Sequence, residues 1–142
     1  MNESIKAEFS FTDYRIPEAS VRFKKENNDN EELSLGLAPK GVYDIKEGDF
    51  ELTLNTVVSV GENPDNYILK CTLIANYKFK EKISLEQIPD FFYKSCLAII
   101  FPYVRAFLST MSLQANTNLY VLPTVNLTSL DRELKDNTTA KK

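Results

Sequence analysis

Side chains that commonly carry catalysis are scarce in this chain. It has no histidine, which removes both the commonest general base near neutral pH and the commonest metal ligand. Its four glycines, Gly36, Gly41, Gly48 and Gly61, form neither a P-loop nor a dinucleotide-binding pattern. We therefore expect no cofactor, no metal site and no phosphate-binding loop.

Two pairs of neighbouring carboxylates could in principle act as acid and base. They are Glu31 with Glu32 and Glu47 with Asp49. Both pairs lie in polar connections, where solvated carboxylates are the rule. Cys71 and Cys96 lie far apart and outside a C-x-x-C spacing, which indicates reduced, buried thiols in a cytosolic chain. We predict that the protein is not an enzyme. The alternative hypothesis is an enzyme that uses carboxylates alone.

The charge and the hydropathy pattern exclude two further classes. The net charge is −3, so no global basic field is available to collect the phosphates of a nucleic acid. Met1 to Phe11 contains no hydrophobic segment of the kind found in signal peptides. The longest apolar stretch, Leu97 to Leu108, is short for a bilayer and contains Pro102 and Arg105. We expect a cytoplasmic protein without membrane insertion.

Alternating apolar residues predict strands in the first two thirds of the chain, because a strand sends successive side chains to opposite faces. Phe50 to Val60 and Tyr67 to Phe79 are the clearest, and the turn residues between them indicate a hairpin. Phe9 to Phe23 is strand-like, with an interruption at Pro17. Leu33, Leu35 and Leu37 alternate again after the polar connection of residues 24–32.

Pro39 and Gly41 are expected to break this last strand. We predict four antiparallel strands in roughly sequence order. With 142 residues, of which 43% are hydrophobic, the chain has the length and composition of a single domain, residues 1–142.

The period changes to that of a helix after Ile83. Apolar residues from Ile88 to Met111 follow i+3 and i+4 spacing, and others fill much of the remaining circumference. Pro102 should bend this long helix. A single sheet covers only one side of such a helix, so we expect another copy of the chain to cover the rest. A short second helix is predicted over Thr128 to Lys135, followed by a disordered tail over residues 136–142.

The run Ile100-Phe101-Pro102-Tyr103-Val104-Arg105, followed by Leu122-Pro123-Thr124-Val125-Asn126, resembles the signature of the SecB family of protein-export chaperones. The order of the predicted elements agrees with that family over roughly Tyr14 to Leu134. The resemblance implies an α+β fold in which a four-stranded antiparallel sheet packs against one long Pro-kinked helix and a short C-terminal helix. It also implies a homotetramer, a dimer of dimers assembled through the long helices.

Members of the family hold unfolded polypeptides in apolar grooves without ATP. On the matching positions, the resemblance assigns client binding to Val21, Phe23, Leu33, Leu35, Leu37, Leu127 and Leu130. The interface between copies is expected on the helix, at Phe92, Cys96, Ile99, Ile100, Tyr103 and Phe107. The expected partners are therefore unfolded or newly made polypeptides and further copies of the chain.

One feature departs from the export members, in which an acidic sheet face docks the translocase motor. Here Lys70, Lys78 and Lys80 occupy the polar face of a long strand, and Arg15 stands where an acidic residue is expected. Docking to that motor is therefore open. The leading hypothesis is an ATP-independent holdase, general or attached to export, and the alternative is a dedicated chaperone of one client, such as the antitoxin of a toxin-antitoxin pair. A structural interaction protein without client binding is a further class.

Overall fold

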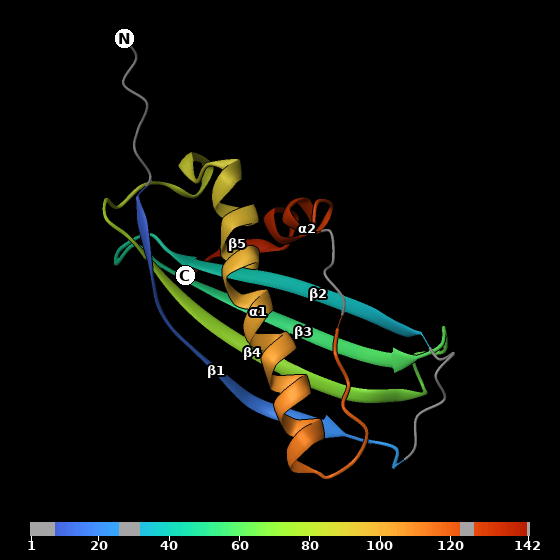
Figure 1. Ribbon diagram of the computed structural model, residues 1–142. Helices are drawn as coiled ribbons and strands as arrows, with labels where there is room; N and C mark the ends of the chain where they lie inside the picture. Colours follow the sequence, from blue (N-terminus) through green and yellow to red (C-terminus); the bar gives the residue numbers. More distant parts are fainter. Residues whose placement is uncertain (1–7, 26–31, 123–126, 142) are drawn as a thin grey trace.

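The computed structural model describes residues 8–25, 32–122 and 127–141. The elements in chain order are β1 (Phe9–Val21), β2 (Leu33–Asp44), β3 (Asp49–Val60), β4 (Tyr67–Phe79), a 3-10 turn at Leu85–Gln87, α1 (Asp90–Gln114), α2 (Leu130–Asp136) and β5 (Thr138–Ala140). The predicted α+β class is confirmed. Figure 1 shows α1 crossing one face of the sheet, with α2 beside it next to β2.

The sheet is five-stranded and mixed, which corrects the prediction of four antiparallel strands in sequence order. Its strand order is β1-β4-β3-β2-β5. β1 pairs with β4, with Phe9 opposite Phe79, so β1 and β2 lie on opposite sides of the central pair. β5 pairs in parallel with β2 at Gly41–Tyr43. A strand of three residues is too short to produce a recognisable alternation, and β5 lies within the segment for which the sequence analysis expects a disordered tail.

β2 continues through the positions expected to break it. Pro39 lies at the outer edge of β2, where its missing N–H removes no hydrogen bond to β3. At Gly41 an added Cβ would collide with the ring of Phe50 and lie 2.9 Å from Oγ1 of Thr138. Glycine at this position therefore allows β5 and the core to approach β2 closely.

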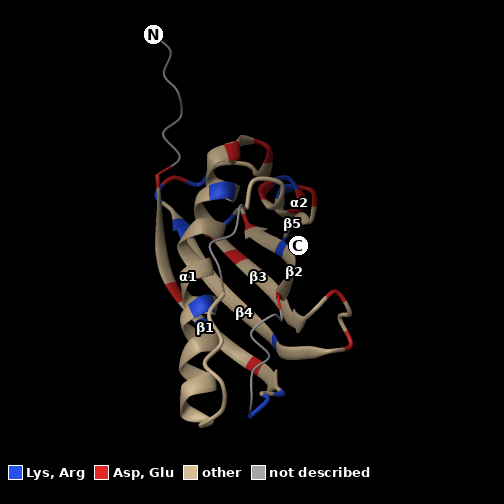
Figure 2. Cartoon of the chain, turned by 45° about the vertical axis from the view of Figure 1, so that its right-hand side comes forward, with Lys and Arg blue, Asp and Glu red and all other residues tan. Residues whose placement is uncertain are grey.

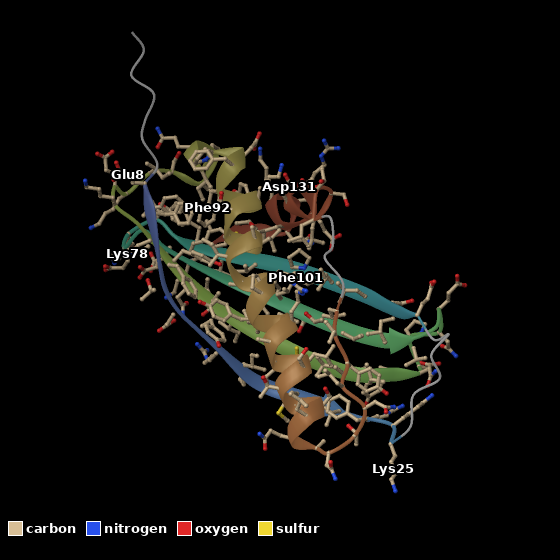
Figure 3. All side chains as sticks on the ribbon, in the orientation of Figure 1. Glu8, Lys25, Lys78, Phe92, Phe101 and Asp131 are labelled. Atoms are coloured by element: carbon tan, nitrogen blue, oxygen red, sulfur yellow. The ribbon has the colours of Figure 1, made fainter. Side chains whose placement is uncertain are left out.

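The core lies between the sheet and α1. Phe92 is fully buried against the rings of Phe9, Phe50 and Tyr77, whose centroids are 4.8, 4.8 and 5.7 Å from its own, and Figure 3 shows it between the helix and the strands. The buried hydroxyl of Tyr77 donates a hydrogen bond to the backbone carbonyl of Cys96 at 2.7 Å. Since a buried polar group without a partner is costly, this bond also holds the helix at a defined position on the sheet.

α1 continues through Pro102, which lies on its exposed side. By length and composition alone this helix is apolar enough to cross a membrane, but the core helix of a soluble protein meets the same requirement, and 39% of its most apolar window is buried inside the fold. Most of α1 consists of uncharged residues, drawn tan in Figure 2. A single copy of the chain therefore leaves part of an apolar helix uncovered.

Candidate functional site

The leucine row, defined as Leu33, Leu35 and Leu37, lies on the helix side of β2. In the β2–β3 register these residues stand opposite Val60, Val58 and Thr56, whose side chains are buried. Residues directly opposite each other in an antiparallel pair share one face of the sheet. The three leucines are half-buried and pack against the core, so the structure brings this part of the predicted client site together as one apolar strip.

Leu127 and Leu130 lie at the start of α2, on the same side of the sheet. Both are half-buried against the core, and the amide of Leu130 donates to the carbonyl of Leu127 at 3.0 Å. Leu134 anchors the helix and is fully buried. α2 packs against β2 (Figure 1), the strand that carries the leucine row.

Val21 and Phe23 lie elsewhere. Val21 ends β1, is 38% exposed and stands opposite Leu69, and β4 and β3 lie between β1 and β2. Phe23 packs against the ring of Tyr120 at 5.7 Å, in the connection that follows α1. The structure therefore separates these two predicted residues from the leucine row and places Phe23 against that connection.

The connection after α1 carries apolar side chains that the sequence analysis does not assign to the site. Tyr120 and Leu122 are buried, whereas Leu119 and Val121 are 50% and 57% exposed. Ser109 holds this segment on α1 by donating from its hydroxyl to the carbonyl of Tyr120 at 2.9 Å. Residues 119–122 are four successive apolar residues, and because an extended segment sends alternate side chains to opposite sides, this run is the signal that could have indicated accessible apolar surface.

The expected interface residues on α1 divide between the two sides of the helix. Phe92, Cys96 and Ile100 are fully buried in the core of their own chain. Tyr103 is 37% exposed and stacks on Tyr14 of β1 with ring centroids 4.3 Å apart. The remaining two, Ile99 and Phe107, are half-buried. The exposed side of α1 also presents Phe91 and Leu113, which are 55% and 62% exposed.

The carboxylates form no reactive pair within the described residues. Asp49 is bound by Lys78 at 3.1 Å, and both side chains are exposed. Glu32 and Glu47 are exposed, and Glu31 lies outside the described residues. No group of three or more His, Cys, Asp or Glu side chains that could hold a metal was found in the part of the chain that the structure describes.

A cavity of about 660 Å³ lies between the start of α1 and α2. Its lining includes Asp90, Tyr93, Asp131, Arg132 and Lys135. Lys135 donates to Asp90 at 2.8 Å and so ties α2 to α1 with a surface ion pair. The mixed charge and the ion pair between the two helices indicate a structural junction.

The face of the sheet away from α1 carries a mixed set of charges. Lys80 pairs with Glu8 at 3.6 Å. Arg22 and Lys70 lie over the ring of Tyr67, 3.7 and 4.4 Å from its centroid. The hydrogen bond from Ser20, with these two cations, lowers the pKa of Tyr67. The sequence analysis expects lysines in place of an acidic face, and in the structure Arg22 and Lys70 form a cluster with Tyr67 on this face.

The thiols are expected to be unreactive in the folded protein. Burial raises the pKa of Cys71 from 9.0 to about 11, and burial raises the pKa of Cys96 well above its usual range. The thiolate is the reactive form, so Ellman's reagent at pH 8 should react over 100-fold more slowly with native protein than with protein unfolded in urea. Rapid titration of both thiols in native protein would contradict this burial.

The raised pKa of Cys71 makes the stability of the fold depend on pH. A raised folded pKa means that the folded chain keeps the proton that the unfolded chain releases. The stabilisation from Cys71 is therefore fully present below pH 9.0 and falls as the pH rises towards about 11. Urea unfolding of Cys71→Ser beside the parent chain at pH 8 and pH 10 measures this difference.

No protein-family model and no curated protein matches the chain. Among solved structures, the fold is similar to that of a SecB-like chaperone from Mycobacterium tuberculosis in complex with a ChAD peptide from the HigA1 antitoxin. The TM-score is 0.67 at 10% sequence identity, covering 83% of this chain and 90% of that chain. A protein of unknown function from Streptococcus agalactiae aligns with a TM-score of 0.49 at 8% identity, over 84% of this chain and 100% of the other. The fold of this chain is thus SecB-like.

Proposed function

We propose that this protein is a chaperone that holds unfolded polypeptides without nucleotide. The observation that carries the proposal is the leucine row, an apolar strip accessible at one edge of a SecB-like fold. Extended clients bind such strips through many weak apolar contacts, whose effects multiply when they are linked on one chain. This mode requires no cofactor and imposes little sequence preference.

The finer alternative is a chaperone dedicated to one antitoxin. It is favoured by the neighbour of similar fold, which was solved with an antitoxin peptide. Genes for a toxin and its antitoxin beside the gene of this protein, together with protection of that antitoxin alone, would decide for the dedicated role. Protection of several unrelated clients would decide for the general role. In either role we propose a soluble cytoplasmic protein.

The proposed active form is a homotetramer that buries the exposed side of α1. This side presents Phe91, Tyr103 and Leu113 to solvent in a single chain. Exposed apolar patches of this kind are typical of association surfaces. The mixed charge around Lys70 and Tyr67 does not offer the acidic surface that the translocase motor of export requires, which favours client holding without that motor.

The test measures assembly mass and client protection together. The protein is mixed with chemically denatured citrate synthase, light scattering follows aggregation without ATP, and light scattering after size exclusion gives the mass. We expect aggregation to be suppressed at about one assembly per client, with a mass above that of the 16.2 kDa chain. A monomer that leaves the client to aggregate would refute the proposal.

A further inference from the structure

Two cations converge on one tyrosine ring on the face of the sheet away from α1. The guanidinium carbon of Arg22 lies 3.7 Å from the ring centroid of Tyr67, and Nζ of Lys70 lies 4.4 Å from the same centroid. We call these three residues the cation cluster. Both helices lie on the opposite face of the sheet (Figure 1), so neither helix covers the cluster.

A β-bulge brings Tyr67 to this face. Between Val58 and Ser59 the β3–β4 register shifts by one residue, so β4 contains one extra residue before Leu69. An extra residue in one strand changes which face the side chains beyond it occupy. Tyr67 therefore shares a face with Lys70, although three residues separate them along the chain and an unbroken strand would place them on opposite faces.

Hydrogen bonds hold the ring and one of the cations in place. Oη of Tyr67 lies 3.1 Å from Oγ of Ser20 on β1. Arg22 donates its backbone amide to the carbonyl of Ile68 at 3.0 Å, and its guanidinium donates to the carbonyl of Asp65 at 3.2 Å. A guanidinium has five N–H donors, so most of them are left for a further acceptor. The cluster is thus arranged before any ligand binds.

Neither cation of the cluster has a carboxylate partner among the described residues. Glu18 lies on the same face, opposite Thr72, but forms no ion pair with Arg22 or Lys70 there. Four other lysines each lie 2.8–3.9 Å from a carboxylate oxygen: Lys78, Lys80, Lys135 and Lys141. Two like charges held close to one ring repel each other, and an anion placed between them removes that repulsion. The cluster is therefore electrostatically suited to an anion from outside the chain.

A cavity of about 420 Å³ adjoins the cluster on this face. Its lining includes Ser20 and Lys70 on one side and Asn55, Val57 and Thr72 on the other. Thr72 donates to Oδ1 of Asn55 at 2.8 Å, which leaves the side-chain N–H groups of Asn55 to donate to an acceptor. The cavity thus combines a cation and an amide donor with the apolar side chain of Val57.

We propose that the cation cluster and this cavity bind an acidic, extended segment of a partner protein, with one of its carboxylates between Arg22 and Lys70. Charge complementarity carries the choice of partner, because two cations without counter-charges and an amide donor favour a carboxylate. The surface lies on the opposite face from the leucine row, so it goes beyond the proposed holding of clients. A nucleic acid fits less well, since the net charge of the chain is −3 and the cluster supplies few contacts to phosphates.

The first test measures the binding of fluorescein-labelled octaglutamate to the full chain by fluorescence anisotropy. We expect saturable binding that weakens as NaCl is raised from about 50 to about 200 mM. Arg22→Gln with Lys70→Gln should lower the affinity at least about 10-fold. Lys78→Gln with Lys80→Gln is the matched control, since it removes the same charge from two lysines that already have carboxylate partners. It should change the affinity less than about 2-fold.

The second test leaves the net charge unchanged. Tyr67→Leu removes the ring that positions both cations, whereas Tyr67→Phe keeps the ring and loses only the contact with Ser20. We expect the leucine variant to bind octaglutamate about 5-fold more weakly and the phenylalanine variant to bind within about 2-fold of the parent chain. Circular dichroism of each variant should match that of the parent.

Several outcomes would overturn the proposal. They are no binding of octaglutamate by the parent chain, an equal loss of affinity in the two lysine-containing double variants, and unchanged affinity in Tyr67→Leu. Tighter binding of an eight-residue oligothymidylate, lost in Arg22→Gln with Lys70→Gln, would assign the cluster to nucleic acid instead. A lower assembly mass in that variant would assign it to a second copy. The same variant should still suppress the aggregation of citrate synthase, so failure of the parent chain in that assay would refute the holdase alone.

Discussion

Replacing Leu35 and Leu37 together by glutamate should abolish the suppression of client aggregation. Each leucine contributes half-buried apolar surface on the helix side of β2. Removing apolar contact with two side chains and placing two carboxylates beside an apolar client costs about 3 kcal/mol or more. The affinity for a denatured client should therefore fall about 100-fold, measured by fluorescence anisotropy of labelled, carboxymethylated α-lactalbumin.

The matched control places the same two charges on the opposite face of the same strand. Ser34→Glu with Ala38→Glu changes the net charge equally, but these side chains point away from α1. This variant should keep its client affinity within a factor of about 2. Unchanged suppression of aggregation by Leu35→Glu with Leu37→Glu, with an intact assembly, would remove the leucine row from the client site.

Replacing Phe92 by alanine should lower the free energy of unfolding by about 3–5 kcal/mol. Its side chain is fully buried, and its ring lies within 4.8 Å of the centroids of Phe9, Phe50 and Phe79. Alanine would leave a cavity at the centre of this aromatic cluster. Because a domain is stable by only about 5–15 kcal/mol in total, the loss should be plain in urea unfolding at one fixed protein concentration.

The neighbouring phenylalanine provides the control. Phe91 is 55% exposed on the other side of α1, so Phe91→Ala should change the free energy of unfolding of a dilute sample by less than about 1 kcal/mol. The same variant should weaken self-association if the exposed side of α1 forms the proposed interface. Equal destabilisation by the two substitutions would show that α1 is packed on the sheet by a different side.

The division of α1 between core and surface could not be read from the sequence. A helix that is apolar almost all round has no polar stripe to mark its outer side. The sequence pattern therefore treats Phe92, Cys96 and Ile100 like Tyr103, although the first three are fully buried and Tyr103 is 37% exposed. Which side faces the sheet depends on contacts with strands that lie far away in the chain.

The strand order is undetermined by the sequence for a similar reason. The β3–β4 hairpin is predicted correctly because both its alternation and its turn are local signals. The pairing of Phe9 with Phe79 joins residues that are far apart in the chain, and it leaves no trace in local periodicity. β5 lacks an alternation of its own and is recognisable only once Gly41 of β2 is in place beside it.

The sequence by itself determined the α+β class, the two long central strands, the long helix and the apolar character of the leucine row. Each of these follows from side-chain spacing over a few neighbouring residues. Tertiary structure alone decided that β1 pairs with β4, that Phe92 faces inward, and that β5 pairs with β2 only at Gly41–Tyr43. These features depend on packing between distant segments, where the free energy comes from burial and hydrogen bonding across the fold and not from local preference.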